Sequence, residues 1–167
     1  MQLKLMPQSL GGKMDKLVEH FMKQAIKEAG KAAAKGEIPV GAVIVKDGRI
    51  ISRGHNEKER KNDPTFHAEI SAIRKASLKL GTWRLNDCDM YATLEPCPMC
   101  AGAIIQARIR KVCIGAPDPK AGAAGSVVNL FAEDRFNHKV EVVWGVLEEE
   151  CSSALKNFFA QLRNKNR

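Results

Sequence analysis

The sequence has no apolar run that approaches the roughly 20 residues of a membrane-spanning helix, so it does not read as a membrane protein. The segment from Met1 to Lys13 lacks the continuous apolar core of a secretory signal, and export is therefore not expected. Aromatic residues are scarce at 5%, but hydrophobic residues make up 44% of the chain, which is typical of a globular protein. The 167 residues suit one domain, and we predict a cytoplasmic protein.

Cysteine is also sparse, and the five cysteines are an odd number in a chain without an export signal. This argues against a disulfide framework. Cys88, Cys113 and Cys151 are expected to be buried as small apolar residues, although a metal-ligand role for one of them stays an alternative. The other two, Cys97 and Cys100, are three residues apart and directly follow a proline.

This Pro-Cys-x-x-Cys segment, residues 96–100, predicts half of a metal site. Two thiolates at positions i and i+3 lie on one face of a helix. His67, about thirty residues earlier, supplies a third ligand, and Glu69 adds a carboxylate close by. A structural zinc site normally has four protein ligands, whereas a catalytic site leaves the fourth position open to water. The set His67, Cys97 and Cys100 therefore predicts catalytic zinc, with Glu69 moving protons in a metal-assisted hydrolysis.

A surplus of basic residues gives the chain a formal net charge of +8. Such a charge favours polyanionic partners without identifying one, and a purely solvated basic surface is the alternative. The bases gather in two places. They are Arg108, Arg110 and Lys111 after the cysteine pair, and Lys156, Arg163, Lys165 and Arg167 at the C-terminus.

Helical and strand patterns alternate along the chain after one N-terminal hairpin. Helices are expected at about residues 16–35, 65–80, 97–108 and 148–162. Strands are expected at 40–45, from 50 to about 54, and at 89–94, 111–114 and 140–144; residues 57–63 and 115–126 are expected to be loops. This order predicts an α/β protein, a three-layer α/β/α sandwich with a mixed sheet of about five strands. Residues 14–167 are expected to form the single domain, with residues 1–13 as a flexible extension and Met14 as the natural start.

The motif His67-Ala68-Glu69 with Pro96-Cys97-x-x-Cys100 resembles the signature of the zinc-dependent cytidine/deoxycytidylate deaminase family. That core motif is shared by cytidine, cytosine and guanine deaminases. The flanking segments 37–42, 62–70, 94–103 and 120–126 are similar to those of the bacterial tRNA-specific adenosine deaminases. The resemblance covers nearly the whole chain from Met14 onwards.

The resemblance implies a cytidine deaminase-like fold, one Zn²⁺ per subunit and a homodimer. It implies hydrolytic deamination of adenosine to inosine at the wobble position of a tRNA anticodon, with release of ammonia. In it, His67, Cys97 and Cys100 bind zinc and Glu69 shuttles protons. Phe66 departs from the small residue usual in these enzymes, which changes the rim of the pocket.

Four further positions correspond to substrate contacts by the same resemblance. They are Asn56, Ala68, Asp118 and Phe158. Asn56 would hydrogen-bond the flipped base, and Asp118 would lie near the neighbouring nucleotide. Two alternatives stay open: Asn56 is a simple turn residue, and the 115–126 loop is a passive connection.

Two other functions remain open from the sequence. One is deamination of a free base or nucleoside, and the other is zinc-stabilised RNA binding without catalysis. Glu69 discriminates against the second, because a closed structural zinc site has no use for a carboxylate beside it.

Overall fold

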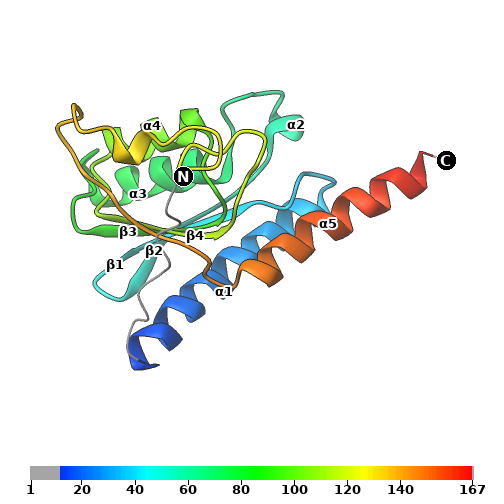
Figure 1. Ribbon diagram of the computed structural model, residues 1–167, viewed down its shortest axis with the longest axis horizontal. Coiled ribbons are helices and arrows are strands. Elements are labelled where there is room, and N and C mark those ends of the chain that lie inside the picture. The colour runs from blue at the N-terminus through cyan, green and yellow to red at the C-terminus, as the bar shows by residue number, and fades with distance from the viewer. Residues whose placement is uncertain (1–11, 167) are drawn as a thin grey trace, which may run out of the picture.

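A five-stranded mixed sheet lies between two layers of helices in this computed structural model, which describes residues 12–166 (Figure 1). The strands are β1 (Gly41–Lys46), β2 (Arg49–His55), β3 (Cys88–Leu94), β4 (Lys111–Ala116) and β5 (Glu141–Val143). The helices are α1 (Gly12–Ala34), α2 (Lys58–Lys61), α3 (Ala68–Leu80), α4 (Pro98–Gln106), the 3-10 turn η1 (Leu130–Ala132) and α5 (Glu148–Lys165). The predicted α/β/α sandwich is confirmed. Residues 1–11 of the predicted extension lie outside the described residues.

The sheet has the order β2-β1-β3-β4-β5. β1 pairs antiparallel with β2 and β3, whereas β3, β4 and β5 run parallel. The first hairpin forms because Asp47 and Gly48 both take positive φ values, 50° and 70°, as the favoured two-residue turn requires. β1 is buried on both faces, as its unbroken apolar sequence predicts.

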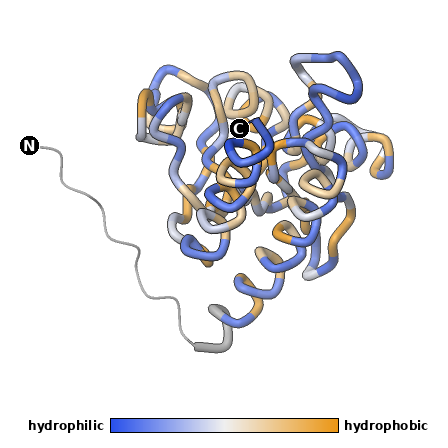
Figure 2. Tube along the Cα trace, turned by 90° about the vertical axis from the view of Figure 1, so that its right-hand side faces the viewer, coloured by the Kyte–Doolittle hydropathy of each residue, from blue (hydrophilic) through white to orange (hydrophobic). Residues whose placement is uncertain are grey.

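Side chains of β1 alternate between two cores on opposite faces of the sheet. Ile44 belongs to the core under α3 and α4, and Val43 to the core over α1 and α5. Hydrophobic and hydrophilic residues alternate along the helices in Figure 2, as one-sided packing requires. The three cysteines predicted to be buried, Cys88, Cys113 and Cys151, are buried. Among the described residues, no helix is both long and apolar enough to cross a bilayer.

The predicted exposed loop at residues 57–63 contains a short helix, α2, that the sequence pattern did not indicate. A glutamate from an earlier part of the chain explains why this helix forms. The buried carboxylate of Glu37 accepts hydrogen bonds from the backbone N–H groups of Arg60 at 2.7 Å and Glu59 at 3.3 Å. These N–H groups lie in the first turn of α2, where no helical partner exists for them. The prediction missed α2 because its stabilising group comes from another part of the chain.

Helix α3 begins three residues later than expected, and helix α4 begins one residue later. His67 and Cys97 are the N-cap residues of α3 and α4, with extended backbone, and Pro98 takes the first position of α4. The carboxyl ends of the parallel strands β3 and β4 meet at one edge of the sheet. At this edge β3 lies between β1, which is antiparallel to it, and β4, which is parallel to it. Open α/β sheets bind their ligands outside the carboxyl ends of the parallel strands.

Candidate active site

Three side chains from two helix starts converge into one cluster. One ligand atom from each of His67, Cys97 and Cys100 lies within 4.8 Å of the others. Nδ1 of His67 lies 3.7 Å from Sγ of Cys97 and 3.5 Å from Sγ of Cys100. Tetrahedral zinc, with bonds of about 2.1 Å to nitrogen and 2.3 Å to sulfur, separates its ligands by about 3.6 Å. The three residues therefore fit a zinc ion without rearrangement.

Packing of α3 beside α4, on the same face of the sheet, brings the cluster together (Figure 1). His67 precedes the first turn of α3, while Cys97 precedes and Cys100 belongs to the first turn of α4. Helix N-termini carry partial positive charge, which favours thiolate over thiol.

The charge distribution within the cluster follows from its hydrogen bonds. A hydrogen bond with Cys100, supported by one with His67, lowers the pKa of Cys97 to about 4. The hydrogen bond with Cys97 and burial raise the pKa of Cys100, so the two sulfurs share one proton. The interaction with Cys97 also raises the pKa of His67. A sulfur anion beside an imidazole is the donor set that a soft divalent cation such as zinc prefers.

Glu69 lies in the first turn of α3 and is 3% exposed. Its Oε2 is 3.5 Å from Sγ of Cys100, so the carboxyl group touches the cluster. Burial raises the pKa of Glu69 above its usual range. A carboxyl group whose pKa is raised by burial can act as a proton donor as well as a proton acceptor, which is what a general acid-base group must do.

Asn56 is buried directly after β2, and both ends of its side chain are held. Its Nδ2 donates to the carbonyl of Ile38 at 3.3 Å, and its Oδ1 accepts from the N–H of Lys58 at 3.2 Å. The next residue, Glu57, donates its N–H to the carbonyl of Phe66, immediately before His67. Asn56 therefore lies in the segment that is hydrogen-bonded to the start of the metal cluster.

The other predicted substrate contacts lie in different surroundings. Ala68 is fully buried, so only its backbone N–H at the start of α3 is suited to a ligand. Asp118 is partly buried in the loop after β4, where its Oδ1 accepts from the N–H groups of Lys120 and Ala121.

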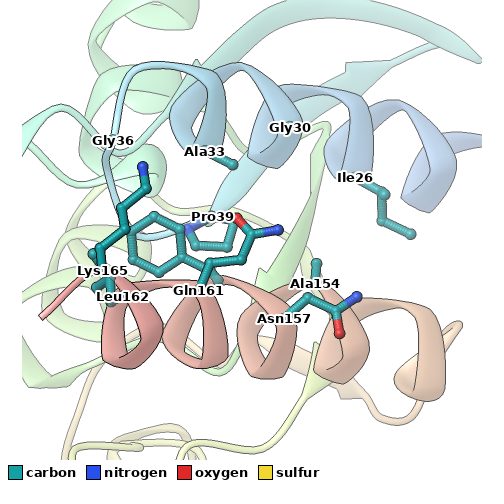
Figure 3. A pocket seen from close by; sticks show the side chains of 11 residues that line it. Ile26, Gly30, Ala33, Gly36, Pro39, Ala154, Asn157, Gln161, Leu162 and Lys165 are labelled. Atoms are coloured by element: carbon teal, nitrogen blue, oxygen red, sulfur yellow. The ribbon is translucent and has the colours of Figure 1, made fainter. Parts of the chain in front are cut away.

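Phe158 lines a cavity of about 310 Å³ between α1 and α5. Figure 3 shows Gln161 and Lys165 reaching from α5 towards α1 across this cavity. Pro39 also lines it, one residue from Ile38, whose carbonyl Asn56 contacts. The cavity thus extends to the chain segment beside Asn56.

Two buried carboxylates near the site, Glu37 and Glu95, were missed by the sequence reasoning. They are 1% and 2% exposed, and both accept hydrogen bonds from backbone N–H groups, Glu37 from helix α2 and Glu95 from the loop after β4. The signal that could have found them is an acid flanked by apolar residues and followed shortly by proline, as in Glu37-Ile38-Pro39 and Leu94-Glu95-Pro96. A buried acid in such a place needs donors, and loops with free N–H groups supply them.

Comparison with known proteins places this geometry in a family. The MafB19-like deaminase family matches residues 16–163. A tRNA-specific adenosine deaminase of Bacillus subtilis is 54% identical over 149 residues, covering 89% of this chain and 92% of the relative. A solved structure from work on A-to-I editing by tRNA:A34 deaminases is 48% identical, with a TM-score of 0.79, over 81% of this chain and 99% of its own.

A guanine deaminase structure from Bacillus subtilis is also similar, at 40% identity and a TM-score of 0.59, over 87% of this chain and 93% of its own. Both the sequence identity and the structural agreement are higher for the tRNA deaminases than for this enzyme. The chain therefore belongs to the MafB19-like deaminase family and, within it, to the tRNA-specific adenosine deaminases.

Proposed function

We propose that this protein converts adenosine at the wobble position, position 34, of a tRNA anticodon into inosine by hydrolytic deamination. The observation that carries the proposal is the cluster of His67, Cys97 and Cys100 with the buried carboxyl group of Glu69 against it. The three-ligand set and the adjacent acid support chemistry on water, and the similarity to tRNA-specific adenosine deaminases supports the substrate.

His67, Cys97 and Cys100 would hold one zinc ion in each subunit, since their spacing matches tetrahedral coordination. Bound zinc supplies a water molecule whose pKa is lowered to about 7. The burial of Cys100 and Glu69 limits access of bulk water to this side of the cluster. The proton that leaves the attacking water therefore needs an acceptor from the protein.

Glu69 is the acceptor that the geometry supports. Its carboxyl group would take the proton of the attacking water as the oxygen adds to C6 of adenine, and would deliver it to the ring nitrogen. The second proton of the water, on the oxygen now bonded to C6, would pass through the same carboxylate to the amino group, which would leave as ammonia, so that the oxygen would remain at C6 as the carbonyl of inosine. General acid-base catalysis of this kind contributes about 10²- to 10⁴-fold to a rate.

Substrate contacts would come from residues around the cluster. The fixed side chain of Asn56 would hydrogen-bond the flipped adenine, and the backbone of Ala68 would face it. Asp118 and Phe158 would contact neighbouring nucleotides. A base must leave its stack to reach a buried site, which a single-stranded anticodon loop permits at low cost. The net charge of +8 would favour the phosphates of tRNA.

The proposal includes a cytoplasmic homodimer. Exposed apolar side chains in the segment after the 115–126 loop, Val127, Val128 and Phe136, support contact with a second subunit. Light scattering of the purified protein at micromolar concentration would measure the mass directly.

The test is an inosine assay on tRNA transcripts with adenosine at the wobble position, using wild-type protein and Glu69→Ala. Free adenosine, cytidine and guanine serve as control substrates. We expect inosine from the wild type, and a variant that binds zinc and folds normally but has lost at least 10²-fold in rate. If the protein deaminated free guanine and made no inosine in tRNA, the proposed tRNA substrate would be wrong and guanine would take its place. Near-wild-type turnover by Glu69→Ala would refute the assigned role of Glu69.

A further inference from the structure

The carboxylate of Glu95 is almost fully buried between the end of β3 and the loop that follows β4. It accepts three hydrogen bonds from the backbone of this loop. The N–H of Asp118 donates to Oε2 at 2.8 Å, and the N–H groups of Ala124 and Ser126 donate to Oε1 at 2.9 and 3.0 Å. One side chain therefore ties together both ends of a nine-residue stretch, 118–126.

The surrounding backbone fits closely around this carboxylate. The N–H of Ala123 donates to the carbonyl of Pro96, and the N–H of Glu95 donates to the carbonyl of Ala116. A Cβ atom added to Gly122 would lie 2.2 Å from Oε2 of Glu95, so only glycine fits there. The 118–126 loop is thus wrapped around the carboxylate with no room for another side chain.

Glu95 is also two residues from Cys97 in the chain, and Pro96 between them accepts the hydrogen bond from Ala123, so the loop is bonded to the segment that leads into the metal cluster. The loop it holds carries Asp118, whose predicted contact is with the substrate. Asp118 uses its own Oδ1 to cap the N–H groups of Lys120 and Ala121, so its side-chain position follows the position of the loop. The distance between the loop and the cluster consequently depends on the Glu95 carboxylate.

We propose that Glu95 is a positioning residue, which holds the 118–126 loop against the metal cluster as a preformed wall of the RNA-binding pocket. This inference rests on the proposed function, because it assigns the loop a role in RNA binding. A carboxylate suits the task, since it accepts hydrogen bonds at both oxygens and these bonds are strengthened by its charge. An amide in its place presents an NH₂ group to one of the three N–H donors and loses that bond.

The expected effect is on substrate binding rather than on the chemical step. A loop that is ordered only part of the time lowers the apparent affinity by the fraction of molecules in the competent state. Loss of one charge-assisted hydrogen bond corresponds to about a tenfold change in the equilibrium constant between the ordered and the open loop, and to the same change in that fraction once the open loop predominates. Glu95→Gln should therefore raise KM for an anticodon stem-loop about tenfold and change kcat less than about threefold.

The matched control is Glu28→Gln. Glu28 is a comparably buried glutamate, 3% exposed, but it lies on α1, across the sheet from the metal cluster, and its partners are side chains such as Lys31 and His55. Its replacement removes a buried charge without touching the 118–126 loop. KM, kcat and exchange of the loop amides should stay at wild-type values in this control.

Both zinc-loaded variants are compared with the wild type in three measurements: zinc content, steady-state kcat and KM with the stem-loop, and amide hydrogen exchange over residues 117–128. The inference predicts normal zinc content, a raised KM and faster loop exchange for Glu95→Gln only. The inference would be overturned if KM were unchanged in Glu95→Gln, or if Glu28→Gln raised KM by the same factor. It would also be overturned if Glu95→Gln lost its zinc together with kcat.

Two further outcomes are separable. If the wild type makes no inosine, the proposed function fails, and the exchange measurement alone decides whether Glu95 orders the loop. If Glu95→Gln does not fold, Gly122→Ala takes its place, because it disturbs the same contact from the loop side. Slow loop exchange and a wild-type KM in Gly122→Ala would then refute the inference.

Discussion

Gly54→Ala is predicted to damage both stability and activity, because β2 and α3 touch at this position. A Cβ atom on Gly54 would lie 2.2 Å from the carbonyl oxygen of Ala68 and 2.8 Å from the backbone nitrogen of Ala72. Ordinary contacts of a Cβ atom begin near 3.4 Å. The obstructing atoms belong to the backbone of the first turns of α3, so no rotamer change relieves the overlap. The helix must instead move away from the strand by about 1 Å.

The size of the effect follows from this displacement. Overpacking a well-packed contact costs about 1–3 kcal/mol, and a rigid backbone contact places Gly54→Ala near the upper end, at about 3 kcal/mol. Ala68 separates the predicted zinc ligand His67 from Glu69, so the same movement shifts both groups. A misplacement of about 1 Å in catalytic geometry costs about 10²-fold in rate.

Urea unfolding followed by circular dichroism measures the first effect, and the inosine assay with zinc determination measures the second. Gly102→Ala in α4 is the control, because a Cβ atom there has no neighbour within 4 Å. That change should stabilise the protein by about 0.5–1 kcal/mol, as for Gly to Ala in a helix. Wild-type stability and rate in Gly54→Ala, or an equal loss of stability in Gly102→Ala, would contradict the reasoning.

Four further predictions concern the rest of the domain. Ile104→Ala removes a fully buried side chain of α4 and should lower the free energy of unfolding by about 2–5 kcal/mol in urea titrations. Burial raises the pKa values of Cys113 and Cys151 from 9.0 to about 12, so neither thiol of the native protein should react with iodoacetamide at pH 8. Because these pKa values are higher in the folded than in the unfolded state, their contribution to stability is present below pH 9 and should be lost as the pH rises from 9 to 12, which unfolding titrations across that range would detect. Arg110→Ala should cost less than about 1 kcal/mol, even though its guanidinium contacts both oxygens of Asp89, because the arginine side chain is 61% exposed.

Local patterns were enough to predict most of the sheet. The unbroken apolar sequence around Val43 and Ile44 predicted a central strand, and Asp47-Gly48 predicted the hairpin, because both depend on residues adjacent in the chain. Helix α2 could not be predicted in this way. Its sequence is polar throughout, and its first turn is stabilised by Glu37, some twenty residues away.

The same distinction between local and long-range contacts applies to the candidate site residues. The pair Cys97 and Cys100 is recognisable from its spacing within a single helical turn. Glu95 precedes the pair by two residues, yet its hydrogen bonds to the loop after β4 depend on how β3 pairs with β4. No spacing rule relates residue 95 to residue 124, so the packed sheet was needed to find that contact.

The sequence by itself determined which chemical groups the site has at its disposal, an imidazole, two thiols and a carboxyl group, and which helix starts carry them. It determined the alternation of strands and helices as well, because periodicity and turn residues act over a few positions. Only the tertiary structure decided that Nδ1 of His67 lies within 3.7 Å of both sulfurs and that Glu69 is buried against Cys100. The physical reason is that these distances depend on the packing of α3 against α4 over a shared sheet, and such packing joins residues about thirty positions apart.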